Sequence, residues 1–527
     1  MRHLPFARLA LAVTACLLAA GALAAPAAAA GSGTIRDLLT DDAQMTTAVV
    51  HGRLVDTEGS PQSGYTVNVT LDDDDNWVNY DTTTDANGDW SVSGIDAGAY
   101  RVSFVTPDWE RTQWAYGAGM PKEADLFTVE AGSSVTVDDT WLPGATLVIN
   151  AVDAATGAPV SNYCVWVDSP GDGTGCTTGS QVTVSDLPGG TFQLTVTPDE
   201  SSYYLWHPET PVTLTAGQTT TVTVPLTLGG KVAVTATDHA THQPVRDTCP
   251  IYKVLGHGGL GDGYGDCTGS TGKSTSRSLA PGTYEMFAVA PGAFGHQWVG
   301  KAGGTGNQRA AARIVVEPGK TVAAPTVLLD KAGIITGVVT GSDGVAIADV
   351  DVAYSAWGFG AGPGWDTETN ASGRYTLGKL GPYKWPLLFT AGRGYPRQWS
   401  GNVANRFKAD TVPVTSGATS TYDIALTKTS TLEGTVTVPS APTADWRITA
   451  FNAATGDEMG MFDSTAAGPG GSYAMSLTGR QQVKIAWIYF ADDVGHNGWY
   501  DDATDIDTAT KVGIPSAGTK QLNLTIG

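Results

Sequence analysis

The stretch Ile95-Asp96-Ala97-Gly98-Ala99-Tyr100 contains the pattern that decides the fold: an aliphatic residue, a glycine turn, and an aromatic residue that opens an alternating apolar run. The pattern returns at Leu187, Leu279, Leu380 and Leu477, and its last two copies are weaker. The five starts are 92, 92, 101 and 97 residues apart. Each copy predicts a strand, a tight turn and a second strand. A period of this length indicates a tandem array of similar units.

A second phrase recurs with the same period: a short alternating strand that ends in glycine and is followed by another strand. It occurs at 127–132, 212–217, 314–319, 412–417 and 512–518. Units of about 85–100 residues with short alternating strands predict two-sheet sandwiches. The predicted units are 48–143, 144–228, 229–330, 331–430 and 431–527.

The composition of the 527-residue chain favours an all-β protein with many turns, because it contains 66 Gly and 28 Pro and is rich in Thr, Val and aromatic residues. The net charge is −22. An acidic chain of this kind is a poor partner for nucleic acid or an anionic membrane. Solubility of an exported protein is sufficient to explain the charge.

The N-terminus predicts export. Arg2 and Arg8 flank a polar start, an apolar run follows from Leu9 to Leu23, and small residues come next. We expect a signal peptide over 1–30, cleaved near Ala30, then a polar leader over 31–47 and an extracellular protein. Cys16 lies in the middle of the apolar run, which argues against a lipoprotein anchor. No second run is long enough to span a membrane, so we expect no integral membrane segment.

Four cysteines remain after cleavage, and they fall as two pairs within single units. Each pair flanks a glycine-rich loop, so we predict the disulfides Cys164–Cys176 and Cys249–Cys267. A zinc site would require thiolates from two separate units, which is the less favoured alternative.

The first unit resembles a known family. The phrase Gly52-Arg53-Leu54-Val55-Asp56, the turn at 84–90 and Gly98-Ala99-Tyr100 resemble the carboxypeptidase regulatory-like domain, and the fourth unit repeats this phrasing. The resemblance implies five tandem seven-stranded Greek-key β-sandwiches of prealbumin-like type, in an exported bacterial protein. That fold is grouped with the starch-binding-like, carbohydrate-binding-like folds, so the implied partner is a polysaccharide or a cell-surface glycan.

Nothing in the sequence predicts catalysis. Five sandwiches use the whole mature chain, and neither His-Glu-x-x-His nor Gly-x-Ser-x-Gly is present. The acidic clusters at 72–75 and 501–507 do not follow the spacing of a calcium loop, which favours solvated loops. We therefore expect no catalytic residues, no cofactor and no metal.

One tryptophan per unit recurs beyond the repeated pattern. The five are Trp114, Trp206, Trp298, Trp399 and Trp499, and the first four lie 14 residues after the aromatic residue of the pattern. In three units a glutamine comes directly before the tryptophan. The series has two interpretations. The rings are either platforms that stack on sugars while the neighbouring amide binds hydroxyl groups, or structural caps on the ends of the sandwiches.

Three functions remain open on the sequence. The leading hypothesis is a secreted, non-catalytic, multi-domain protein that binds polysaccharide. The first alternative is a structural stalk or surface-interaction protein without a small ligand. The second alternative is an exported starch-degrading, alpha-amylase-like hydrolase, which only the fold resemblance suggests.

Overall fold

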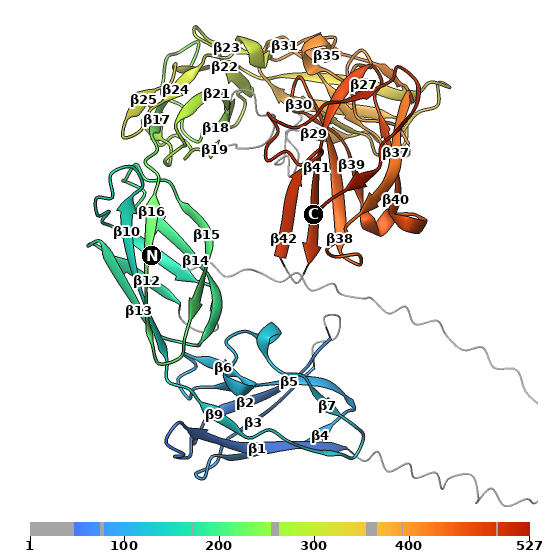
Figure 1. The fold of residues 1–527 in the computed structure, drawn as a ribbon. Coiled ribbons are helices and arrows are strands. Elements are labelled where there is room, and N and C mark those ends of the chain that lie inside the picture. The colour runs from blue at the N-terminus through green and yellow to red at the C-terminus, as the bar shows by residue number, and fades with distance from the viewer. Residues whose placement is uncertain are drawn as a thin grey trace, which may run out of the picture.

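The computed structural model describes residues 47–73, 78–169, 173–254, 263–354, 366–392, 394–491 and 494–527. The expected signal peptide, and the expected leader except its last residue, lie outside these residues. Within them the chain consists of strands, turns and three-residue 3-10 segments, which confirms the all-β class (Figure 1). No helix in this described part is long and apolar enough to cross a membrane.

The first strand set forms two facing sheets. One sheet contains β1 (Ala48–Asp56), β4 (Asp89–Ile95), β8 (Ser134–Thr136) and β9 (Asp139–Trp141). The other contains β2 (Thr66–Leu71), β3 (Asn79–Thr83), β5 (Gly98–Val105), β6 (Thr112–Trp114) and β7 (Phe127–Val129). Buried and exposed residues alternate along β1 and β4, so each strand turns one face to a shared core.

The second strand set repeats this plan. One sheet contains β10 (Ala145–Asp153), β13 (Gln181–Leu187) and β16 (Thr219–Leu226). The other contains β11 (Tyr163–Val167), β12 (Thr174–Thr177), β14 (Gly190–Pro198) and β15 (His207–Leu214).

The sheets of the third and fourth sets consist of shorter strands. One sheet of the third set contains β17 (Lys231–Asp238), β20 (Lys273–Thr275), β25 (Thr321–Ala323) and β26 (Val327–Leu329). The other contains β18 (Cys249–Val254), β19 (Gly263–Tyr264), β21 (Gly282–Val289), β22 (Gln297–Val299), β23 (Gly304–Thr305) and β24 (Ile314–Val316). In the fourth, the first sheet is β27 (Gly333–Gly341), β30 (Arg374–Leu380), β35 (Thr419–Thr421) and β36 (Ile424–Leu426). Its partners are β28 (Asp351–Ala353), β29 (Asp366–Glu368), β32 (Leu388–Thr390) and β33 (Gln398–Trp399), with a separate pair β31 (Lys384–Trp385) and β34 (Val412–Pro413).

The fifth set closes the described chain. One sheet contains β37 (Ser430–Thr437), β40 (Ser472–Leu477), β44 (Gly518–Gln521) and β45 (Leu524–Thr525). The other contains β38 (Asp445–Asn452), β39 (Glu458–Asp463), β41 (Gln481–Ala491), β42 (Val494–Trp499) and β43 (Val512–Ile514). We call the five sets units one to five. The exact domain limits given above stay a prediction.

A glycine in the first strand of three units lets the last strand cross it closely. An added Cβ atom would lie 1.9 Å from Val137 O at Gly52, 1.8 Å from Tyr422 O at Gly337 and 1.9 Å from Leu522 O at Gly434. At this point the parallel ladder breaks, as between β8 and β9. Unit two has Ile149 at the corresponding place, and its β16 pairs with β10 without interruption.

The residue after each crossing carbonyl repairs the break. Asp138 Oδ1, Asp423 Oδ1 and Asn523 Oδ1 accept hydrogen bonds of 2.9, 2.8 and 3.1 Å from the backbone N–H that follows the glycine. The side chain thus replaces the backbone acceptor that the ladder lacks here, since buried N–H groups require a partner.

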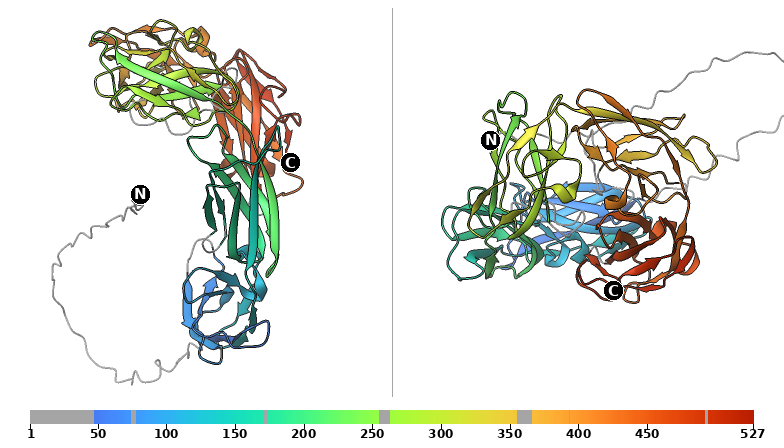
Figure 2. Two further views of the ribbon diagram at one scale, coloured as in Figure 1. Left: turned by 90° about the vertical axis from the view of Figure 1, so that its left-hand side faces the viewer. Right: turned by 90° about the horizontal axis from the view of Figure 1, so that it is seen from above.

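Neighbouring units meet through buried contacts rather than through linkers. Between units one and two, the Arg111 guanidinium donates to Asp186 Oδ1 at 2.7 Å and to Leu142 O at 2.6 Å, and it lies 4.2 Å over the Trp141 ring. Units three and four share one hydrophobic cluster, in which Phe287 of unit three packs with unit-four residues. Figures 1 and 2 show the fourth and fifth units turned back from the line of the first three.

His296 lies at the contact between units three and four. Its backbone bonds to Lys379 O and to the N–H of Gly381, and its Nδ1 is 2.6 Å from Tyr354 Oη. Burial, followed by the positive charge of Lys379, lowers the pKa of His296 from 6.5 to about 4. The neutral imidazole is therefore the form that the folded junction holds.

We predict that Gly337→Ala destabilises unit four by about 1–3 kcal/mol, because the new methyl group collides with a backbone carbonyl that the sheet holds in place. Calorimetric melting of the mature protein measures the effect. Gly378→Ala is the matched control, because a Cβ atom at Gly378 in the same unit meets nothing within 4 Å. Equal melting of the two variants would contradict the close-crossing argument.

We also predict acid destabilisation of the junction between units three and four. The unfolded chain takes up a proton on His296 near pH 6.5 and the folded chain only near pH 4. Stability is therefore complete above pH 6.5 and falls by about 3 kcal/mol as the pH drops to 4. Melting temperatures of the wild type and His296→Gln across this range test this. The melting temperature of the wild type should fall with pH more steeply than that of the variant, and the difference is the contribution of His296. Equal slopes for the two proteins would contradict the prediction.

Candidate binding face of the second unit

The five tryptophans of the repeated series do not share one environment. Trp399 is 0% exposed, Trp298 and Trp499 are also buried, and Trp114 is partly buried. Trp206 alone in the series is open to solvent, with 69% of its surface exposed. Three of the rings thus have no free face for a sugar, while Trp206 has one.

The buried rings pack against the ends of their own units. Trp298 meets Phe287 edge to face at 5.2 Å between ring centroids. Trp399 packs against Leu388, and Trp499 packs with Ile506 and Ala509 in a small separate cluster. Burial of this kind fits the structural-cap interpretation at these three positions, and the choice between cap and platform stays a prediction.

The glutamines that precede three of the rings also have a structural task. The Gln398 side chain donates to Thr427 O and accepts from the Thr427 N–H, both at 3.2 Å. Gln113 donates to Thr140 O and accepts from the Leu142 N–H, both at 2.9 Å. The Gln297 amide donates to Leu328 O at 3.0 Å. Each of these amides thus bonds to the end of its unit's last strand, and their binding of ligand hydroxyls stays a prediction.

A second exposed tryptophan, outside the repeated series, accompanies Trp206 in unit two. Trp166 lies on β11 with 56% of its surface exposed, between the buried residues Val165 and Val167. The sequence analysis missed it, although the alternation of residues 163–167 places it on the outer face.

Both rings belong to the same sheet of unit two. Trp166 on β11 is opposite Thr195 on β14, whose side chain is buried. Trp206 comes directly before β15, and the first residue of β15, His207, pairs with Val196 on β14. Thr197, the next residue on β14, is exposed. The sheet β12-β11-β14-β15 thus carries one open ring on its outer face and a second at the start of its edge strand.

The disulfide Cys164–Cys176 stiffens this face. The two cysteines are direct cross-strand partners on β11 and β12, and they lie beside Trp166 on the outer side. A shallow depression of about 450 Å³ adjoins the bridge and includes Thr197 and Asp199. Hydrogen bonds from Ser201 keep the pKa of Asp199 below its usual value, so this carboxylate is charged at neutral pH.

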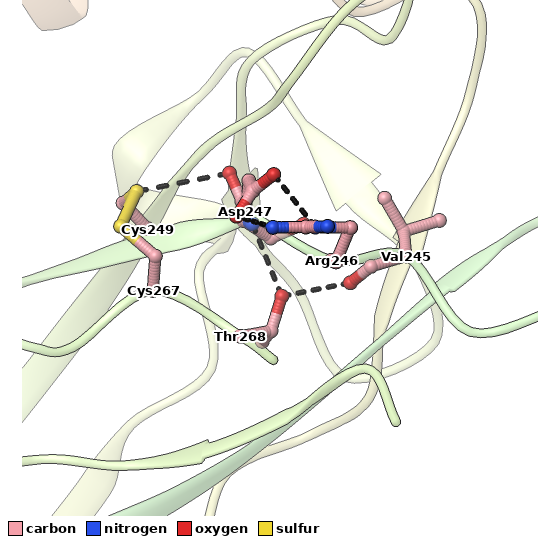
Figure 3. The surroundings of a disulfide bond; sticks show 7 residues. Val245, Arg246, Asp247, Cys249, Cys267 and Thr268 are labelled. Carbon is pink, nitrogen blue, oxygen red and sulfur yellow. Dashed lines mark hydrogen bonds and ion pairs between the residues drawn. A yellow bond between two sulfur atoms is a disulfide. The ribbon is translucent and has the colours of Figure 1, made fainter. Parts of the chain in front are cut away.

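The second predicted disulfide, Cys249–Cys267, is also present, in unit three (Figure 3). Thr268, next to Cys267, donates from Oγ1 to Val245 O at 2.7 Å and accepts from the Thr248 N–H at 3.0 Å. The bridge therefore fixes a turn that is already hydrogen-bonded.

No group of three or more His, Cys, Asp or Glu side chains in the described ranges is arranged to hold a metal ion. The buried acids have structural partners instead. Asp139 accepts from the Tyr116 N–H at 2.8 Å, Glu285 accepts from Gln308 at 2.7 Å, and Asp457 pairs with Arg406. Burial raises the pKa of all three carboxyl groups.

Comparison with known proteins supports the resemblance of unit one. The sequence profile of the carboxypeptidase regulatory-like domain matches residues 49–140. No curated protein matches the chain.

Solved structures that match include three bacterial pilins. The minor pilin of Streptococcus agalactiae is 13% identical, with 34% of this chain and 95% of that chain covered and a TM-score of 0.25. The major pilin of Bacillus cereus is 13% identical, with 54% and 99% covered and a TM-score of 0.14. The shaft pilin of Lactobacillus rhamnosus GG is 11% identical, with 36% and 97% covered and a TM-score of 0.19. The fold assignment rests on the strand pairing described above.

We predict opposite outcomes for two tryptophans of the series. Trp399→Ala should destabilise its unit by about 3–5 kcal/mol, because it leaves a large cavity in a packed end. Trp206→Ala should change stability by less than about 0.5 kcal/mol, because the ring is already in solvent. Thermal melting of both variants tests this. Equal destabilisation by the two changes would show that burial of the Trp399 ring does not determine how much it contributes to the stability of its unit.

Proposed function

We propose that this chain is an exported, non-catalytic surface protein in which the outer face of unit two binds polysaccharide. The other units hold this face in place and extend it from whatever the protein is attached to. The two disulfides suit an oxidising, extracellular compartment. The proposal includes the five-domain division of the chain.

The observation that carries the proposal is the pair of exposed rings, Trp166 and Trp206, at one sheet of unit two. Flat aromatic rings stack on the apolar faces of pyranoses, and the exposed hydroxyl of Thr197 on the same sheet suits the hydroxyl groups of a neutral sugar. A sheet crossed by a disulfide presents the rings without an ordering cost when the ligand binds.

A purely structural role is the second candidate, and the junctions favour it. Arg111 at the first junction and Arg406 at the last are buried or partly buried cations with acidic partners in the adjoining unit. Such contacts keep neighbouring units from swinging freely, as a stalk requires. The hydrolase alternative gains nothing, because the carboxyl groups with raised pKa values are engaged in the junctions and cores described above.

We predict that replacing both Trp166 and Trp206 with alanine weakens binding to a polysaccharide by about tenfold or more, because each ring contributes stacking area. Affinity electrophoresis of the mature protein through gels containing soluble starch, other glucans or cell-wall glycans measures this. The melting temperature should stay the same.

Trp109→Ala is the matched control, because Trp109 is 68% exposed but belongs to unit one. Polysaccharide in the gel should retard this variant as much as it retards the wild type. A wild-type protein that no polysaccharide retards would leave the stalk as the function, and release of reducing sugar from starch would favour the hydrolase.

A further inference from the structure

A cavity of about 150 Å³ lies between units three and four. Its walls are aromatic: Trp298 from unit three, and Tyr354, Trp399 and Phe407 from unit four. Two 3-10 segments border it, η3 (Gln308–Ala310) in unit three and η4 (Arg406–Lys408) in unit four. The cavity is separate from the outer face of unit two and shares no residue with it.

Both 3-10 segments are held in the same way. Asn307 Oδ1 accepts from the Arg309 N–H at 3.1 Å, and Asn405 Oδ1 accepts from the Phe407 N–H at 2.9 Å. Both capped segments carry an arginine that lies against the same ring, that of Phe407. The Arg309 guanidinium lies 3.9 Å from the Phe407 centroid, and that of Arg406 lies 4.8 Å from it.

Arg309 at the edge of the cavity is an exposed cation. Its guanidinium contacts the Phe407 ring and makes no ion pair or hydrogen bond with any described residue. An unpaired guanidinium beside an aromatic cavity suits an acceptor-rich group.

The charges around the cavity favour an anion. Arg309 has no acidic partner among the described side chains, whereas the two nearby acids are already engaged, Glu285 by Gln308 and Asp457 by Arg406. Burial disfavours the charged forms of both acids and raises their pKa values. A carboxylate offers only acceptors and pairs with guanidinium groups, so it matches the unpaired guanidinium of Arg309.

We propose that this cavity binds a small carboxylate with a single flat or alicyclic ring, of the size of benzoate. The volume carries the size limit, because about 150 Å³ holds a ring such as benzene and little more. The aromatic walls would enclose the ring, and Arg309 at the mouth would bind the carboxylate. Because Trp298 and Arg309 come from unit three while Trp399 and Phe407 come from unit four, the ligand would also bind the two units together.

Isothermal titration calorimetry of the mature protein with sodium benzoate tests the proposal, and saturation-transfer NMR reports whether the ring is enclosed. We expect saturable one-to-one binding of benzoate. Benzyl alcohol, which keeps the ring but lacks the charge, should bind about tenfold or more weakly, and so should acetate, which keeps the charge but lacks the ring.

Arg309→Gln should weaken benzoate binding by about tenfold to a hundredfold, because it removes the cation and leaves the exposed backbone turn intact. Arg374→Gln is the matched control: Arg374 is an exposed arginine of unit four that makes no side-chain ion pair in the described structure. It should bind as the wild type does, and so should the Trp166→Ala, Trp206→Ala double variant.

Three results would overturn the proposal: no benzoate binding at millimolar concentration, equal binding of benzoate and benzyl alcohol, or unchanged binding by Arg309→Gln with a normal melting temperature. The first would show that the cavity holds only water. Failure of the polysaccharide assay on unit two would leave this outcome unaffected, since the two sites share no residue.

Discussion

The structure depends on how the last strand of each unit is held against the first. In units one, four and five a glycine of the first strand lets the last strand cross it so closely that the parallel ladder between the two strands breaks. Backbone groups at the break still require partners. An Asp or Asn at the break supplies one in these three units. In units one, three and four the glutamine before the recurring tryptophan also bonds to the end of the last strand, beyond the break. The recurring Gln-Trp pair thus belongs to the closure of the sandwich.

This closure limits where a ligand can bind. Rings that cap a sandwich end, such as Trp298 and Trp399, are almost wholly covered by packing. Two places still offer aromatic surface to a ligand: the sheet of unit two that carries Trp166 and Trp206, and the cavity between units three and four. In unit two the opposite sheet closes the core with an uninterrupted eight-residue ladder between β10 and β16.

The third and fourth units behave differently from the first two. They share a hydrophobic cluster and a buried histidine, and the fifth unit joins them through Arg406 and Asp457. Buried charges at such contacts stabilise only when both partners are in place, so these junctions make the relative placement of the units specific. The small aromatic cavity arises because two capped ends, each with its own tryptophan, meet face to face.

The sequence by itself determined the all-β class, the period of the units and both disulfides, because strand alternation, glycine turns and cysteine spacing are local properties of the chain. It also identified the recurring tryptophans, yet it could not separate caps from platforms, since burial depends on what the neighbouring unit covers. Trp166 escaped notice because a single aromatic residue on a strand has no local signature of exposure. The glutamine clamps, the buried His296 and the cavity between units three and four were decided only by tertiary structure, which brings together groups about 30 to 110 residues apart in the chain.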